Sequence, residues 1–386
     1  MNTDTSSLTP SAALTARQQL MLAGGRGPRH TALHANFSEK HIDLDRFVAA
    51  VATAMRCCGA LALSVEHCKD ERPKMAQRSL KIENAIAQLN VGGTFSSNDG
   101  LFAVGIDKHG QGGVTLSLSV SNLIWDTPSL HNFMLCLDEA YADEPLYPEA
   151  YTFIDYARAE AEMRLTAAHA EQQRLWRDKF MPLASSGIAG GTACATAEMH
   201  LDIAPEQMEQ LCSALGTSPD CVLAAAYAKS LTQLLHSPNA AFAVAHNPRT
   251  ANPAAAYTTG PMMQLLPVVA DCGTMPEEIG SRLNELTRNQ AYGYADFVLD
   301  NEARLRFSIS YLAGIMCHPV SCGAACAETI TGIGMNHGED LGLFVHHNTH
   351  GGLTLRAEYR TTAFSPQQAN TLLHHYAHTL EAQLKP

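Results

Sequence analysis

Residues 121–127, with the sequence SNLIWDT, bring an amide, a carboxylate and two hydroxyl groups together in one short corner. The amide of Asn122 can donate and accept hydrogen bonds, but it cannot take a proton near neutral pH. The corner therefore favours positioning of a reactant over general base catalysis at Asn122. Ser121 has no GxSxG sequence around it, so a serine nucleophile is not expected there. Asp126 lies next to an expected helix start, where the helix dipole favours a carboxylate.

A strand and a helix flank this corner and must position it. Residues 114–120 alternate apolar and polar side chains, which predicts a strand. Residues 130–141 repeat apolar side chains at helical spacing, with Thr127 predicted as the N-cap and Pro128 at the first helical position. Asn122 is then expected at the end of the apolar face of the strand.

Other histidines and cysteines have the right chemistry in less specific surroundings. His246 lies three residues before Arg249, where it is either a substitute base or a structural histidine at a strand end. Residues 346–352, HHNTHGG, contain a histidine pair in a predicted hairpin loop. Metal-like spacing is loose and lacks CxxC, so no metal site is predicted in the set Cys317, His318, Cys322 and Cys326. No phosphate-binding or nucleotide fingerprint is present either.

Composition narrows the class of protein. A chain of 386 residues with 46% hydrophobic and 17% charged residues predicts a folded protein with a large interior. A net charge of −12 without a Lys or Arg run argues against a nucleic-acid partner. No apolar stretch has the ~18 residues of a membrane span. The N-terminus lacks the pattern of a secretory signal, and eleven cysteines, an odd number, favour a reducing, cytoplasmic location.

The chain divides at residues 181–196, a small and uncharged segment that predicts a linker. We expect an N-terminal lobe of residues 1–180 and a C-terminal lobe of residues 197–386, each mixing helices and strands, which makes the fold class α+β. Helices are predicted near 43–56, in two segments between 150 and 180, at 219–235 and 276–291, and after a capping box at 365–368. Strands are predicted near 61–66, 198–203, 241–245, 262–269, 305–311, 341–347 and 353–359.

The strand, corner and helix resemble the signature of the condensation domains of nonribosomal peptide synthetases, whose corner reads HHxxxDG. Asp126 matches that motif, whereas Ser121 and Asn122 replace both histidines and Thr127 replaces the glycine. Further segments resemble the family in the same order along nearly the whole chain. They are Leu14, Thr15 and Gln18 (LTxxQ), residues 155–157 (DYA) and 175–176 (YW), Asn247 to Arg249, residues 260–267 (GxFxNTLPL, with Gln264 for Asn), 289–292 (HQDxP) and 353–381.

This resemblance implies two lobes with the fold of chloramphenicol acetyltransferase, which form a V-shaped pseudo-dimer with a tunnel between them. The chain looks like a free-standing condensation-type protein without a cofactor of its own. A partner acyl or peptidyl carrier protein would present an acyl thioester on its phosphopantetheine arm from one side of the tunnel. A small amine or alcohol acceptor would enter from the other side.

The resemblance also assigns roles to residues. Asn122 occupies the position of the family's catalytic histidine, so Asn122 and His246 are the candidate catalytic residues. Asp126 is expected to pair with Arg249 as a structural brace. Ser121, Trp125 and Gln264 are expected to bind substrate.

Two functions remain open at this point. One is an acyltransferase of natural-product biosynthesis that forms an amide or ester with a non-standard active site; Asp126, Arg249 and the segment 260–267 favour it. The other is a catalytically inactive relative that serves as a binding or scaffolding partner of an assembly line. The replacements at Ser121, Asn122 and Thr127 favour that alternative.

Overall fold

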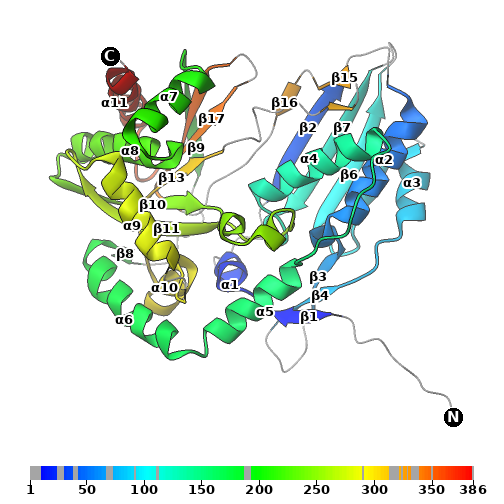
Figure 1. The fold of residues 1–386 in the computed structure, drawn as a ribbon, viewed down its shortest axis with the longest axis horizontal. Helices are drawn as coiled ribbons and strands as arrows, with labels where there is room; N and C mark the ends of the chain where they lie inside the picture. The colour runs from blue at the N-terminus through cyan, green and yellow to red at the C-terminus, as the bar shows by residue number, and fades with distance from the viewer. Residues whose placement is uncertain are drawn as a thin grey trace.

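The computed structural model describes residues 10–23, 30–37, 42–66, 73–90, 93–109, 113–186, 193–288, 291–312, 321–322, 325–327, 329–331, 339–348 and 351–384. Figure 1 shows a mixed α+β fold in which two groups of strands and helices lie side by side. We refer to them as the first and second half, according to the chain segments that supply most of each. The V shape and the tunnel expected from the family remain predictions.

The first half is built on a five-stranded sheet with the strand order β16-β2-β7-β6-β5. Its central strand, β7 (Val114–Ser121), buries every second residue from Val114 to Val120, which confirms the predicted alternation. The other elements of this half are β1 (Ser11–Ala13), α1 (Ala16–Ala23), β2 (His30–Phe37), α2 (Leu44–Cys57), β3 (Leu63–Glu66), β4 (Lys74–Gln77), α3 (Ile82–Asn90), β5 (Thr94–Ser96), β6 (Phe102–Lys108), α4 (Thr127–Tyr141) and α5 (Phe153–Met163). Helix α6 (Ala167–Phe180) follows α5 in the chain but packs against the second half (Figure 1), where Trp176 and Phe180 share a core with Phe297. Apolar side chains of α2 and α4 join those of β7 in one core.

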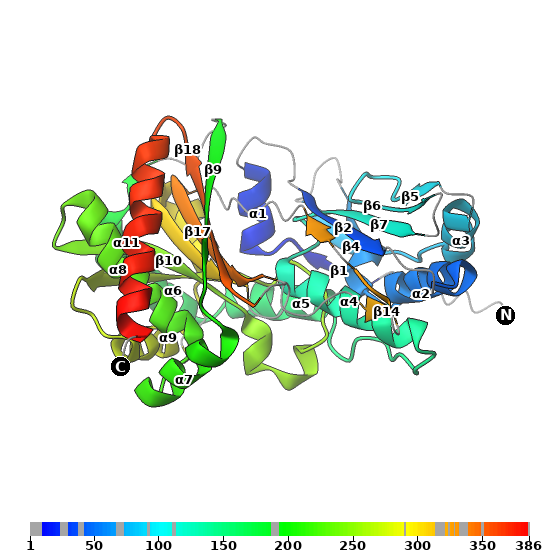
Figure 2. The ribbon, with the colours of Figure 1, turned by 90° about the horizontal axis from the view of Figure 1, so that it is seen from above.

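The second half is built on a six-stranded sheet with the order β11-β10-β13-β17-β18-β9. The pairs β10–β13 and β13–β17 are parallel, and the remaining pairs are antiparallel. Helices α8 and α11 cover one face of this sheet and share a core with it (Figure 2). Its elements are β9 (Cys194–Leu201), α7 (Pro205–Leu215), α8 (Pro219–Leu235), β10 (Asn239–His246), β11 (Gln264–Asp271), α9 (Pro276–Arg288), α10 (Tyr294–Asn301), β13 (Phe307–Tyr311), β17 (Leu341–His347), β18 (Leu353–Arg360) and α11 (Pro366–Leu384).

Short strands connect segments that are distant in the sequence. Strand β16 (Thr329–Thr331) comes from the second half of the chain but pairs with β2, so it forms an edge of the first sheet. Strand β8 (Ser185–Ser186) lies within the predicted linker and pairs with β12 (Ala303–Arg304). Strands β14 (Ser321–Cys322) and β15 (Ala325–Cys326) form a separate pair. No single cut in the sequence therefore separates the two halves.

Most predicted elements of the second half are present. Helix α8 and strand β17 have the predicted bounds, and the predicted capping box precedes α11. Ser365 Oγ accepts a hydrogen bond from the Gln368 amide (3.2 Å), and Gln368 Oε1 accepts one from the Ser365 amide (2.9 Å). Among the described residues, no helix is both long enough and apolar enough to cross a membrane.

Candidate functional site

The corner after β7 leads directly into α4, but its cap differs from the predicted one. Asp126, rather than Thr127, is the N-cap: its Oδ1 accepts a hydrogen bond from the Ser129 amide at 3.0 Å. A carboxylate is a strong cap, because it satisfies a free amide and also interacts favourably with the helix dipole. Thr127 and Pro128 consequently occupy the first helical positions.

Asp126 and Arg249 form a buried, two-pronged ion pair between the halves. Arg249 Nη1 lies 2.9 Å from Asp126 Oδ2, and Nη2 lies 3.0 Å from Oδ1. The Asp126 side chain is only 1% exposed and the Arg249 side chain only 3%. Paired donors and acceptors of this kind fix geometry as well as neutralise charge.

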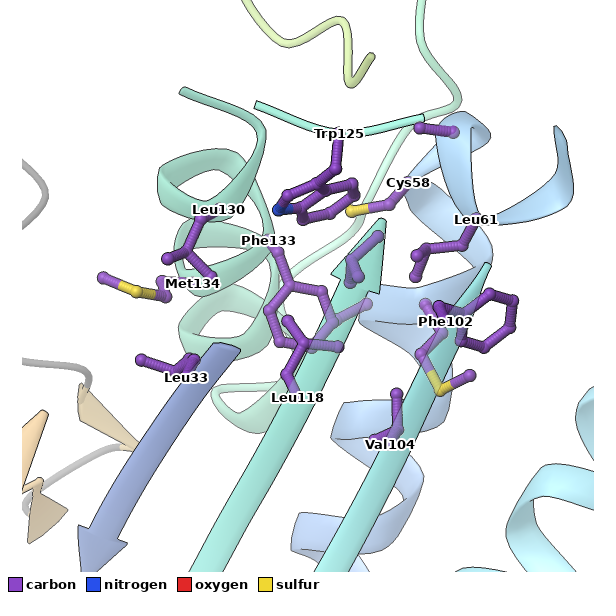
Figure 3. Close-up of a cluster of buried hydrophobic side chains, with 14 of the residues drawn as sticks. Leu33, Cys58, Leu61, Phe102, Val104, Leu118, Trp125, Leu130, Phe133 and Met134 are labelled. Carbon is purple, nitrogen blue, oxygen red and sulfur yellow. The ribbon is translucent and has the colours of Figure 1, made fainter. Parts of the chain in front are cut away.

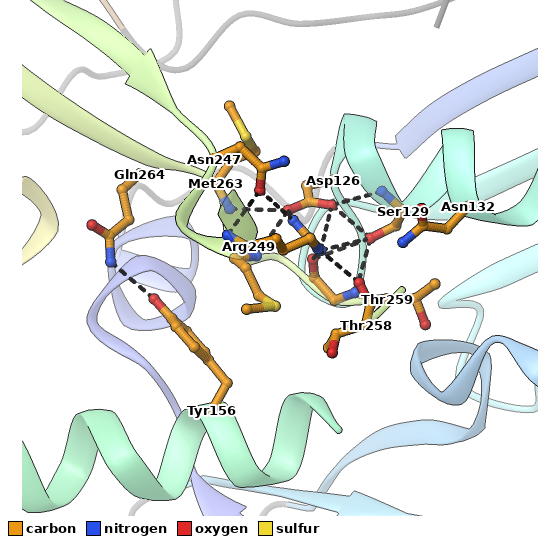
Figure 4. A network of polar contacts seen from close by, with 12 residues as sticks. Asp126, Ser129, Asn132, Tyr156, Asn247, Arg249, Thr258, Thr259, Met263 and Gln264 are labelled. Carbon is orange, nitrogen blue, oxygen red and sulfur yellow. Dashed lines mark hydrogen bonds and ion pairs between the residues drawn. The ribbon is translucent and has the colours of Figure 1, made fainter. Parts of the chain in front are cut away.

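The remaining hydrogen-bonding capacity of Asp126 is also used (Figure 4). Its Oδ2 accepts from the amides of Met262 and Met263, both at 2.9 Å. Burial raises the pKa of Asp126, but Arg249 and the hydrogen bonds outweigh burial, so the pKa lies below its ordinary value. Asp126 is thus a buried anion held from several sides; that its role is structural stays a prediction.

Arg249 in turn holds the loop that precedes β11. Its Nε donates to the Thr258 carbonyl at 2.7 Å, and its Nη2 donates to the Gly260 carbonyl at 2.8 Å. The Gly260 amide donates to Ser129 Oγ on α4 at 2.8 Å. One network therefore connects the corner of the first half to the β11 loop of the second.

Two other corner residues lie inside the first core. Trp125 is fully buried, and its indole lies beside Cys58, Leu130 and Phe133 (Figure 3). Ser121 is also fully buried, and its Oγ accepts a hydrogen bond from the Leu123 amide at 3.2 Å. Both side chains hold the corner against the first core. Of the two, Trp125 also lines the cavity described next, and Ser121 does not.

Asn122 lies at the surface of a small cavity between the two halves. The Thr31 hydroxyl on β2 donates to Asn122 Oδ1 at 2.7 Å. This contact orients the amide, which still offers its two N–H donors. Because Thr31 pairs with Val120 across the β2–β7 ladder, the sheet register itself places the hydroxyl next to the corner.

The cavity has a volume of ≈ 30 Å³, enough for about two water molecules. Both halves contribute to its walls. They are formed by Arg17, Thr31, Asn122, Trp125, Asp126 and Thr127 from the first half and by Ala245, Met263, Gln264, Leu265, Ser310 and Leu312 from the second. No histidine belongs to this lining among the described residues. The charged groups of this lining are one cation, Arg17, and one carboxylate, Asp126, which is paired with Arg249; neither is a base that titrates near neutral pH.

Of the remaining candidate residues, the structure places Gln264 at the cavity and His246 outside it. Gln264 Nε2 donates to the Tyr156 hydroxyl at 2.9 Å, which connects β11 to α5. His246 pairs with Gln264 across the β10–β11 ladder, but the neighbouring Ala245 is the residue that lines the cavity. Burial lowers the pKa of His246 below its ordinary value. Its use as a base at the cavity would require a different position of the ring.

The other histidine and cysteine segments lie elsewhere. His346 and His347 are the last residues of β17 rather than part of a loop, and burial lowers the pKa of His346 to about 4. Residues 349–350, Cys317, His318 and residues 289–290 lie outside the described residues. Within the part of the chain that the structure describes, no three His, Cys, Asp or Glu side chains are grouped to hold a metal ion.

Sequence reasoning missed Arg17, Thr31 and Ser310 as parts of the site. Arg17 occupies a variable position of the LTxxQ-like segment, and β2, which carries Thr31, was not predicted at all. Ser310 lies in the predicted strand that is now β13, but nothing in an alternating strand indicates which polar residue faces a cavity. Only the fold brings these three residues together.

Comparisons with known proteins agree with this architecture. The first condensation domain of the calcium-dependent antibiotic synthetase, in complex with a substrate analogue, is similar with a TM-score of 0.75 and 17% identity over 97% of each chain. The condensation domain of the Monacolin K polyketide synthase MokA is similar with a TM-score of 0.76 and 13% identity, over 96% of this chain and 97% of that one. The X-domain from teicoplanin biosynthesis has a TM-score of 0.70 and 14% identity, over 96% and 94%. At sequence identities this low, the structural similarity shows a common fold.

The sequence itself supplies the family. A comparison with curated proteins gives no match. The condensation domain family model, in contrast, matches residues 29–385, a range that includes the corner, Arg249 and the β11 loop. The chain belongs to the condensation domain family.

Proposed function

We propose that the protein transfers an acyl or aminoacyl group from a carrier-bound thioester to an amine or hydroxyl acceptor at the cavity between its halves. The observation that carries this proposal is the network around Asp126 and Arg249, which fixes the corner whose residue Asn122 lines the cavity. A buried ion pair is costly unless its geometry is maintained. The ion pair is retained beside the residues that replace the family's histidines. This favours a cavity whose geometry still serves to hold reactants.

The proposed reaction needs no base from the protein. The acceptor nitrogen or oxygen attacks the thioester carbonyl carbon, the C–S bond breaks, and the departing thiolate takes up the proton that the acceptor loses. Holding the two reactants in line can supply several kcal/mol of rate enhancement. Asn122, oriented by Thr31, would hold the acceptor or the carbonyl oxygen through its N–H donors.

The thioester would arrive on the phosphopantetheine arm of a partner acyl or peptidyl carrier protein, as expected for the family. The cavity volume of ≈ 30 Å³ admits only a few atoms, so we expect most of the arm and of the acceptor to lie outside it. The proposed reaction would be a step in the biosynthesis of a nonribosomal peptide-like natural product.

Substitution of Asn122 tests the proposal. Asn122→Ala removes a hydrogen bond worth roughly 0.5–1.5 kcal/mol, so product formation should slow severalfold without loss of the fold. Asn122→His should raise the rate, since it restores a group that titrates near neutrality. Asn284→Ala, which alters an exposed asparagine on α9, is the matched control. The measurement is the intact mass of carrier proteins and small products in a reconstituted pathway, with and without the protein.

A second function, a binding partner without chemistry, is favoured by the absence of a histidine from the described cavity lining. The X-domain of teicoplanin biosynthesis, a relative in fold, forms a complex with OxyB. If product requires the protein but is indifferent to Asn122→Ala, Asn122→His and the cavity-filling Ala245→Phe, the binding function replaces the enzymatic one.

A further inference from the structure

Three residues that line the cavity have a buried polar atom without a hydrogen-bond partner among the described residues. They are Arg17 (Nε), Trp125 (Nε1) and Ser310 (Oγ). Ser310 is only 3% exposed. Buried polar groups in native proteins are nearly always paired, so unpaired ones that line a cavity indicate a ligand that supplies the missing partner.

Arg17 also brings a charge that has no direct ion-pair partner among the described residues, although Asp126 and Glu339 act on it from farther away. Its Nη1 donates to the Met263 carbonyl, and no described carboxylate forms an ion pair with it. Asp126, which lines the same cavity, is already occupied by Arg249. Burial lowers the pKa of Arg17, yet a guanidinium stays protonated in proteins. Arg17 is therefore a cation at the cavity without a direct counter-ion among the described residues.

We propose that the cavity binds a carboxylate group of the acceptor, with the Arg17 guanidinium as counter-ion and the Ser310 hydroxyl as a second donor. A carboxylate matches the charge of Arg17, whereas a carbonyl oxygen leaves that charge unbalanced. The volume of ≈ 30 Å³ fits a group of this size and leaves the rest of the molecule in the opening. The acceptor class is thus an amino acid or a hydroxy acid.

The assignment of this carboxylate to the acceptor rests on the proposed acyl transfer. The binding of a carboxylate in the cavity does not depend on that proposal. Binding can be measured with Trp125, because the chain has two tryptophans and Trp176 packs in a separate cluster. In a Trp176→Phe background, Trp125 is the single indole and lines the cavity. Its fluorescence is titrated with acetate and with acetamide, which have the same shape and differ in charge, at constant ionic strength.

We expect a saturable change with acetate and at least a tenfold weaker response to acetamide. Arg17→Gln should weaken acetate binding at least tenfold, and Ser310→Ala should weaken it severalfold. Arg78→Gln, which alters a side chain that is 62% exposed, should leave it unchanged. If Arg17→Gln does not fold, the inference is tested by acetate binding to Ser310→Ala and by the ratio of the wild-type affinities for acetate and acetamide. Equal responses to the two probes, or acetate binding indifferent to the variants, overturn the inference.

A second assay separates this inference from the proposed function. In the reconstituted reaction, glycine should be preferred over glycinamide as acceptor, and Arg17→Gln should reverse or abolish that preference. Selective acetate binding without any product leaves the carboxylate site intact and refutes acyl transfer. Product formation with an equal preference for glycine and glycinamide supports acyl transfer and refutes the carboxylate site.

Discussion

Gly260 shows how closely the residues of the network approach one another. Its φ is +146°, and a Cβ atom placed on it would collide with the ring of Phe153. The same residue donates from its amide to Ser129 Oγ and accepts from Arg249. Any side chain at position 260 must therefore push α5 away from the loop that faces Asp126.

We expect Gly260→Ala to destabilise the protein by about 1–3 kcal/mol and to slow any reaction at the cavity. Gly216→Ala is the matched control, because Gly216 also has a positive φ (+62°) but has open space around its Cα. That control should cost only about 1 kcal/mol. Chemical denaturation of both variants checks the difference, and equal losses would show that backbone strain, not contact with Phe153, is the reason for the glycine.

At the same scale, the sequence predicted the pairing of residues better than their orientation. Asp126 and Arg249 were matched through motifs that are far apart in the sequence, and they are in contact. The assignment of the N-cap to Thr127 was wrong, because the carboxylate of Asp126 serves as cap and ion-pair partner at once. Ser121 was expected at the substrate, but its hydroxyl is bonded within the corner.

Helices α1 and α5 are joined by one carboxylate. Glu160 Oε1 on α5 accepts from the Ala16 amide at the start of α1 (2.7 Å) and lies 3.1 Å from Arg164 Nη2. Burial raises the pKa of Glu160 to about 7, although Arg164 and the Ala16 amide oppose the shift. Since α1 carries Arg17, this junction helps to position the cation of the cavity.

The raised pKa predicts a loss of stability as the pH rises. In the unfolded chain Glu160 loses its proton near its ordinary pKa of 4.5, whereas in the folded protein it keeps the proton to about pH 7. Between these values the unfolded state binds fewer protons, so the free energy of unfolding falls with increasing pH.

Glu160→Gln mimics the protonated form and should remove this contribution, which is on the order of 2 kcal/mol. Melting temperatures of wild type and variant between pH 5 and pH 8 provide the measurement. We expect the variant to gain stability relative to wild type as the pH increases. A difference that is constant across this range would mean that Glu160 is ionised throughout.

Among the elements, those of the second half were predicted more completely than those of the first. Strand β17 begins with a run of apolar residues, β18 alternates apolar with polar residues, and α8 has a long buried face, so the sequence pattern identified them. Strand β2, HTALHANF, has small and polar residues at positions where strand formers are usual. Its neighbours in the sheet, rather than its own composition, make it a strand, and with it Thr31 was missed.

For the whole molecule, the Asp126–Arg249 pair acts as a clamp between halves. Removal of one partner leaves a buried charge without compensation, which costs about 3–5 kcal/mol. We therefore expect Asp126→Ala and Arg249→Met each to lower the melting temperature clearly, and the double variant to lose less than the sum of the two. Glu66→Ala, which breaks an exposed pair with Arg78, should cost less than about 1 kcal/mol.

Denaturant unfolding of this double-mutant cycle provides the coupling energy. If Asp126→Ala melts like wild type yet loses activity, the carboxylate takes part in the chemistry and the structural assignment is wrong. Strict additivity of the two substitutions would show that the halves are held together by other contacts.

Strand β16 gives the arrangement of the halves a further consequence. Residues 329–331 form hydrogen bonds with β2 only after nearly the whole chain has been synthesised, since they are encoded far beyond the boundary at 181–196. Until then the β2 edge remains without that partner, and an open edge is a template for pairing with another chain. A gene divided at the apparent linker would encode a first half with this edge permanently bare. The two halves are thus best regarded as one unit of folding, because the pairing of β16 with β2 crosses the division that the sequence suggests at residues 181–196.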